Sequence, residues 1–112
     1  GVIHIRANVS ISVLTSTAKF DTFAPYNITS TATSATNAIV FGVGGVDAIS
    51  NGTLTEDARY TNVEIFNTGG SQQAVCGYLY KGAMTTETET YAPTVGSGEE
   101  VPLVIAVIEM GN

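Results

Sequence analysis

The sequence predicts an all-β protein, a single antiparallel β-sandwich or jelly roll of about seven or eight strands with a long N-terminal strand. Apolar and polar residues alternate over eleven residues near the start of the chain, which is the period of a strand with one buried side. Turn residues recur roughly every 8 to 12 residues, the spacing typical of sandwiches. No segment carries a sustained helical pattern of apolar residues, so we expect very little helix.

The length and composition fit one folded domain spanning residues 1–112. Hydrophobic residues make up 44% of the chain and charged residues 12%, a balance that favours folding over disorder. The net charge of −6 at pH 7 provides no cationic field for a phosphate backbone, which excludes nucleic acid as a partner. The 16 Thr and 8 Ser leave most of the polar surface uncharged and favour strands over helices.

The first predicted strand runs from Ile3 to Val13, where every odd residue is apolar. At about 3.3 Å per residue this strand would reach about 36 Å, which is longer than an ordinary strand. It therefore either bends between two sheets or extends beyond its own domain. Residues 1–14 are accordingly the candidate for an extended strand shared between subunits.

The next segments are expected to be less regular. Thr15 to Asn37 is rich in Ser, Thr and Ala and contains Pro25, which predicts a loop flanked by short, weak strands. Ala38 to Phe41 predicts a compact strand that ends in a bulge or tight loop at the glycines of residues 42–45.

The second half of the chain predicts a hairpin and two further strands. Arg59 to Phe66 alternates and is expected to pair with Ala74 to Lys81 across a turn. Met84 to Tyr91 is β-prone and acidic, as in a protected edge or a solvated strand. Residues 95–100 predict a turn. Val101 to Met110 is apolar on both sides, so we expect this strand to be central in a sheet or covered by something else.

The longest apolar run is too short to cross a membrane. Val101 to Ile108 contains eight residues, one of them a proline, whereas a spanning helix needs about 20. We therefore expect no membrane span.

The residue inventory gives no catalytic, metal or cofactor site. His4 is the one imidazole and lies on the polar side of the first predicted strand, so we expect a surface or interface histidine. Cys76 is the one cysteine and is expected to behave as a small apolar residue. One His and one Cys cannot supply a zinc site. The carboxylates at Asp47, 56–57 and 99–100 do not follow a calcium loop. We predict a protein that is not an enzyme and needs no cofactor.

One layout of strands and turns resembles known structural modules. Val63 to Gly69 ends in Asn-Thr-Gly, Val75 to Tyr80 returns as a hairpin partner, and Val95 to Leu103 contains a Gly-Glu turn before the next strand. This layout, which covers under half of the chain, resembles the small β-sandwich and jelly-roll modules of phage head-decoration and tail-fibre proteins and of extracellular bacterial filament subunits. The resemblance implies an architectural role and no catalytic residues.

We therefore expect a structural assembly subunit of a virion surface, acting in decoration, tail or fibre. It would self-associate through β-strands and dock on a larger protein lattice. The first strand would supply its apolar side to a neighbour, and the last strand would lie in the receiving sheet. The expected subunit interface consists of Ile3, Ile5, Val9, Ile11, Val13, Leu103, Ile105 and Val107.

Two alternatives belong to this expectation. The first is an extracellular or cell-surface filament, or pilus-like, subunit that polymerises by strand donation. The second is a carbohydrate-binding module that uses Tyr78 and Tyr80 as a glycan face, since aromatic rings stack on sugars.

Overall fold

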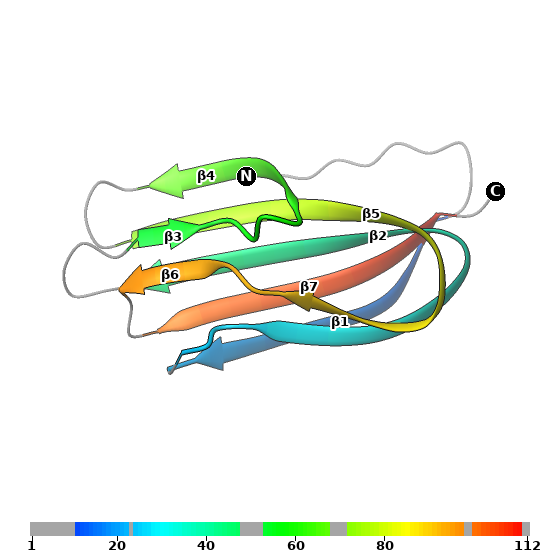
Figure 1. The fold of residues 1–112 in the computed structure, drawn as a ribbon, viewed down its shortest axis with the longest axis horizontal. Coiled ribbons are helices and arrows are strands. Elements are labelled where there is room, and N and C mark those ends of the chain that lie inside the picture. Colours follow the sequence, from blue (N-terminus) through cyan, green and yellow to red (C-terminus); the bar gives the residue numbers. More distant parts are fainter. Residues whose placement is uncertain (1–10, 23, 48–52, 68–71, 98–99, 111–112) are drawn as a thin grey trace.

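The computed structural model describes residues 11–22, 24–47, 53–67, 72–97 and 100–110. Within these residues the chain forms strands and no helix, which confirms the all-β expectation (Figure 1). The strands are β1 (Ile11–Asp21), β2 (Ile28–Asp47), β3 (Thr53–Thr55), β4 (Thr61–Asn67), β5 (Gln72–Tyr91), β6 (Thr94–Ser97) and β7 (Val101–Met110).

Five of the strands form one antiparallel sheet in the order β1-β7-β2-β5-β4, and β3 pairs with β6 in a small second sheet. β7 therefore lies between two neighbours, with Thr17 of β1 opposite Ile105 and Val40 of β2 opposite Val107. The place of β7 inside the sheet agrees with a strand that is apolar on both sides.

β2 and β5 are each 20 residues long and pair with one another from Ile28 opposite Tyr91 onward. Both strands bend over together at one end of the molecule, so that the first half of β2 and the last half of β5 lie in front of the five-stranded sheet (Figure 1). The pairing register shifts between residues 32 and 39, and Gly82 has a φ of 70°. Such irregularities sharpen the local twist and let a strand turn a corner. The fold is thus a β-sandwich, whose second layer comprises these two half-strands with β6 and β3.

The hydrophobic core lies between the two layers. β7 points every second side chain inward, and Val101, Leu103, Ile105 and Val107 are each at most 1% exposed. Full burial of one such side chain contributes about 1.5 to 3 kcal/mol. The other buried apolar residues are Ile28, Ala32, Ala38, Val40, Val46, Leu54, Tyr60, Val75, Met84 and Tyr91.

Polar contacts also join the layers near the bend. Lys81, before the bend of β5, forms an ion pair with Glu89 after it, with 2.8 Å between Nζ and Oε1. The hydroxyl of Ser34 donates a hydrogen bond of 2.7 Å to Oε2 of Glu109. The polar side chains that point inward at the bend therefore have partners within the protein, as buried polar groups require.

The loop expected over Thr15 to Asn37 is wrong for most of its length. β1 continues to Asp21 and β2 begins at Ile28, so the connection comprises residues 22–27. The hydroxylic residues fit strands because the inward ones are small, and Thr15 and Ser30 place their hydroxyl oxygens 2.5 Å apart across the layers.

The glycines of residues 42–45 lie inside β2 and do not form the expected bulge or loop. Gly42 is required by close packing, because a Cβ atom added there would lie 2.2 Å from Cδ1 of the buried Tyr91 ring. The glycine thus allows the end of the second layer to rest directly on the backbone of the sheet.

Three further expectations need correction or have a partial outcome. Ala74 to Lys81 and Met84 to Tyr91 belong to one bent strand, β5, and residues 95–97 of the expected turn belong to β6. Of the alternating segment Ile3 to Val13, residues 3–10 lie outside the described residues, and residues 11–13 begin β1.

Replacing Gly42 by Ala should lower the free energy of unfolding by about 2 to 3 kcal/mol, because the added methyl group overpacks the core against Tyr91. Urea denaturation followed by circular dichroism measures the loss. Gly45→Ala is the matched control, since its Cβ atom would meet Pro102 Cγ at 3.2 Å on the other side of the sheet. Equal stability of the two variants would contradict the assigned role of Gly42.

Candidate functional site

The five-stranded sheet has one side against the core and one side turned away from the second layer. Directly opposed residues of neighbouring strands share a side of the sheet, so the register identifies the outward side chains. We call this set the outer apolar face. It comprises Ile11, Val13, Ala18 and Phe20 of β1, Pro102, Val104, Ala106 and Ile108 of β7, Ile39, Phe41 and Val43 of β2, and Ala74, Cys76, Tyr78 and Tyr80 of β5.

The outer apolar face is continuous across the sheet. One row of opposed residues crosses all five strands and consists of Ala18, Val104, Val43, Cys76 and Glu64. The adjacent row consists of Ser16, Ala106, Phe41, Tyr78 and Thr61. In both rows the polar side chains lie at the ends, on the edge strands β1 and β4. The three inner strands present carbon, sulfur and aromatic surface.

Much of this apolar surface is open to water. Phe20 is 59% exposed, Tyr80 57% and Val13 64%. The other large apolar residues that are exposed in the described residues are Ile11, Val43, Val63, Tyr78 and Val104. All of them except Val63 belong to the outer apolar face. Scattered apolar residues are normal on a protein surface, but a contiguous patch of this kind marks an interaction site.

The outer apolar face carries almost no charge. Among the described residues, the register assigns two charged residues to this side, Glu64 on the edge strand β4 and Asp47 at the last position of β2. The charges of β1 and β7 have partners elsewhere, since Lys19 pairs with Asp21 at 3.0 Å and Glu109 accepts the hydrogen bond from Ser34. A partner can therefore cover the middle of the face without burying an unpaired charge.

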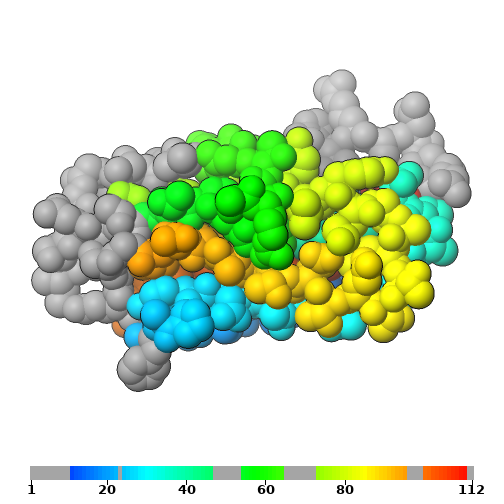
Figure 2. Space-filling model, viewed as in Figure 1, coloured from blue at the N-terminus to red at the C-terminus, as the bar shows by residue number. Residues whose placement is uncertain are grey.

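The outer side of the second layer has the opposite character. We call it the threonine face, and it consists of Thr29, Thr31 and Thr33 of β2 and Thr86 and Thr88 of β5, all exposed. Their hydroxyls pair across the strands, at 2.7 Å between Thr31 and Thr88 and 2.8 Å between Thr33 and Thr86. Figure 2 shows this side of the molecule, where the first half of β2 and the last half of β5 form one continuous surface. The hydroxyl groups suit contact with water.

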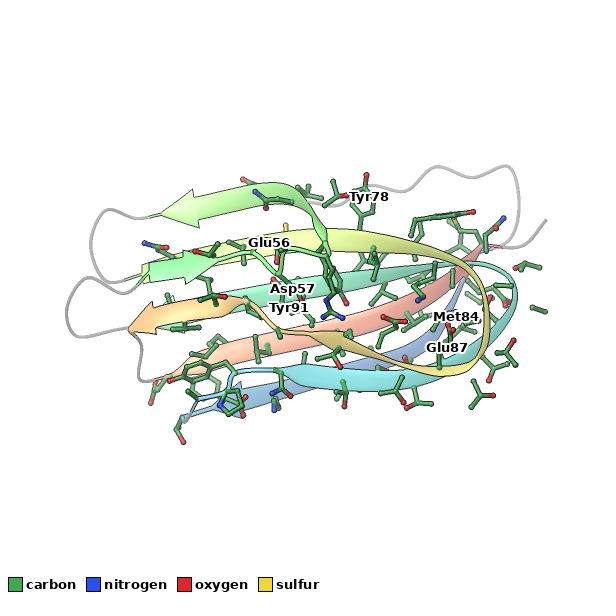
Figure 3. All side chains as sticks on the ribbon, in the orientation of Figure 1. Glu56, Asp57, Tyr78, Met84, Glu87 and Tyr91 are labelled. Carbon is green, nitrogen blue, oxygen red and sulfur yellow. The ribbon has the colours of Figure 1, made fainter. Side chains whose placement is uncertain are left out.

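A polar cluster around the buried carboxylate of Asp57 joins the β3–β4 connection to the end of β5 (Figure 3). Asp57 accepts hydrogen bonds from the backbone and side chain of Arg59, with 2.7 Å between Oδ2 and Nη2, and from the Ala92 backbone N–H at 2.9 Å. Arg59 Nη2 and the Tyr60 hydroxyl both donate to the Thr90 carbonyl. Burial alone would raise the pKa of Asp57, but the hydrogen bonds and charge of Arg59 outweigh it and lower that pKa. Each of these bonds stays within the chain, so the cluster is a structural tie.

Glu56 and Tyr91 lie beside this tie, and their polar atoms lack good hydrogen bonds. Glu56 Oε2 and Tyr91 Oη are buried without a hydrogen-bond partner of good geometry. The carboxylate packs on β5, where a Cβ atom added at Gly77 would lie 2.7 Å from Oε2. Burial raises the pKa of Glu56, an effect that the nearby Tyr91 hydroxyl partly offsets, and burial also raises the pKa of Tyr91.

The expected interface residues divide into three groups. Ile3, Ile5 and Val9 lie outside the described residues, as does His4. Ile11 and Val13 are exposed on the outer apolar face.

Leu103, Ile105 and Val107 point the other way, and the expectation that they contact another subunit needs correction. They belong to the core of this chain and are at most 1% exposed. The outward residues of β7 are those between them, including Val104 and Ala106.

The sequence reasoning missed several residues of the outer apolar face. Phe20, Phe41, Val43 and Val104 were not among the expected interface residues, yet they line its centre and one edge. A usable signal was the apolar character of both sides of residues 101–108 and 38–43, because a sandwich core covers one side of each strand.

The remaining candidate groups show no assembled chemistry. Cys76 is half-buried between Val43 and Glu64 in the register, and burial raises the pKa of its thiol, which opposes reactivity. In the described part of the chain, no three His, Cys, Asp or Glu side chains gather as a metal site.

Tyr78 and Tyr80 are both exposed, on the same side of β5. Their cross-strand neighbours on β2 are Phe41 and Ile39, and the Tyr80 hydroxyl already donates to Asn37 Oδ1 at 2.8 Å. A sugar-binding site needs polar groups around the stacking rings. The apolar neighbours of Tyr78 and Tyr80 are better suited to contact with another protein.

The comparisons with known proteins give no relative. No family model matches the chain, and no curated protein or solved structure matches it significantly. The described residues also include no helix of the length and hydropathy needed to cross a bilayer.

Replacing Asp57 by Asn should lower the free energy of unfolding by about 2 kcal/mol at pH 7, because a charge-assisted buried network loses its anion. Thermal and urea unfolding measure the change. Asp21→Asn is the control: its ion pair with Lys19 is partly exposed, so the expected loss is about 0.5 kcal/mol or less. A loss at Asp57 no larger than at Asp21 would refute the structural tie.

Replacing Glu56 by Gln should raise the free energy of unfolding by about 1 kcal/mol at pH 7 to 8, since a neutral amide is cheaper to bury there than a carboxylate. The pKa of Glu56 is raised by folding, so ionisation destabilises the native protein as the pH increases through that value. The advantage of Gln should therefore vanish below about pH 4, where Glu is protonated in both states. Folding lowers the pKa of Asp57, so this residue has the opposite effect: protonating it makes the protein less stable as the pH falls. Urea unfolding from pH 3.5 to 8 tests both signs, and a Gln advantage that grows on acidification would disprove this assignment.

Proposed function

We propose that this protein is a non-catalytic structural subunit that is built into a larger protein assembly through its outer apolar face. The observation that carries the proposal is the continuous, nearly uncharged apolar surface across the strands β1, β7, β2 and β5. Burying such a surface against another protein contributes about 25 cal/mol per Å² of apolar area removed from water.

The difference between the two broad surfaces of the sandwich supports an oriented position in an assembly. The outer apolar face gains from contact with protein, whereas the hydroxyls of the threonine face are well hydrated. A subunit with this division would have one side bound and one side in water. A virion surface, in a decoration, tail or fibre role, is the setting we propose, in line with the resemblance described for residues 63–103.

A filament subunit that polymerises by strand donation, at the cell surface, is the second candidate. β1 favours it, because this edge strand is held mainly by its antiparallel pairing with β7 and most of its side chains are exposed. In that case the β1 of one subunit would occupy the same place beside the β7 of another. Hydrogen exchange distinguishes the two: dissociating a strand-donated assembly would expose the β7 amides, whereas separating docked faces would leave them protected.

The test of the proposed function is incorporation of a charged variant. Val104 lies in the middle row of the outer apolar face and is 39% exposed, so Val104→Lys should fold and yet fail to enter the assembly. The substitution is made in the gene in its natural source, and assembled particles or filaments are separated by sedimentation. Lysine at this place would bury an unpaired charge on docking, and we expect at least a tenfold loss of incorporation.

Thr31→Lys on the threonine face is the matched control and should incorporate as the original chain does. The proposal fails if the original chain is absent from sedimenting assemblies, or if Val104→Lys incorporates equally well.

A further inference from the structure

We propose that a second copy of this chain covers the outer apolar face, sheet against sheet, in a two-fold symmetric pair. This inference rests on the proposed function, because it names the protein that this surface contacts inside the assembly. Contacts of the pair with the rest of the assembly would use its other surfaces. Three properties of the face favour a second copy over a partner of different chemistry.

The first property is charge. The chain carries a net charge of −6, so two copies repel each other over most approaches. The outer apolar face is where this repulsion is smallest, because the acidic residues that the register assigns to its side lie at the margins, Glu64 on the edge strand β4 and Asp47 at the end of β2. A face-to-face pair therefore removes apolar surface from water without bringing carboxylates together.

The second property is area. Ile108 and Pro102 lie six residues apart on β7, about 20 Å along the strand, and the five strands span about 19 Å across the sheet. With about half the width of a side chain added at each margin, this side of the sheet covers about 600 Å², including its polar rim on β4. Two copies would bury about 1,200 Å² in total, which reaches the lower end of stable specific interfaces.

The third property is shape. Two sheets pack face to face about 10 Å apart when their twists match, with strands inclined by about 30°. A second copy supplies a sheet of the same twist. The contact is also isologous, so each gain made by Phe41 or Tyr80 of one copy is repeated by the other.

Sedimentation velocity of the full purified chain between about 1 and 200 µM tests the inference, together with the rate at which a maleimide labels the native Cys76. Cys76 lies on the outer apolar face, so its labelling should slow at least tenfold as the chain passes from monomer to dimer. Val104→Lys should remain monomeric and label at the rate of the original monomer at every concentration. Thr31→Lys should dimerise like the original chain.

Tyr80→Thr provides a second variant in case Val104→Lys does not fold. Tyr80 is 57% exposed, so truncation should leave the fold intact and still weaken dimerisation at least tenfold. Circular dichroism checks the fold of each variant.

Three results would overturn the inference. A chain that is monomeric at 200 µM with fast Cys76 labelling would do so, and so would a dimer in which Cys76 labels as fast as in the monomer. A monomer that binds neutral oligosaccharides through Tyr80 would favour the glycan alternative instead. In the first case the proposed function still stands if Val104→Lys is excluded from the natural assembly, so the two failures are distinguishable.

Discussion

The antiparallel pairing of β2 with β5 is the contact on which the rest of the molecule depends. Each strand contributes one half to each layer, so the layers are two parts of one bent ribbon. Lys81 and Glu89 tie the ribbon near its bend, and Tyr91 rests on Gly42 farther along. The core between the halves therefore forms only when the ribbon has bent, which couples the bend to the packing of both layers.

This construction explains why one side of the five-stranded sheet is left uncovered. The second layer covers the inner side, where Val40 and Ile105 are fully buried. Nothing in the core requires the outward residues Phe41, Val43 and Val104 to be apolar, and a side that served only as a water-facing surface would normally alternate to polar residues. Their apolar character therefore supports the proposed association, and it is confined to the sheet that the bend leaves open.

The sequence was sufficient for the fold class and for the strand Val101–Met110, whose apolar run over residues 101–108 has clear ends. It was insufficient for the first half of β2, because Ser, Thr and Ala favour no single structure and their partner is remote: Thr31 meets Thr88, 57 residues along the chain. The residues of the outer apolar face could not be identified from the sequence for a related reason. When Leu103 and Val104 are both apolar, alternation shows that they face opposite ways but does not show which of them faces the core. That choice is made by the bend, which depends on contacts between distant residues.

The hydroxyl pairs of Thr31 with Thr88 and of Thr33 with Thr86 lie on the side of the sandwich opposite to the outer apolar face. If two copies meet through that apolar side, both outward surfaces of the pair carry these neutral hydroxyl ladders. Counter-ions screen charges and leave such groups almost unaffected. Hydration of these hydroxyl pairs would then change little between low and moderate salt.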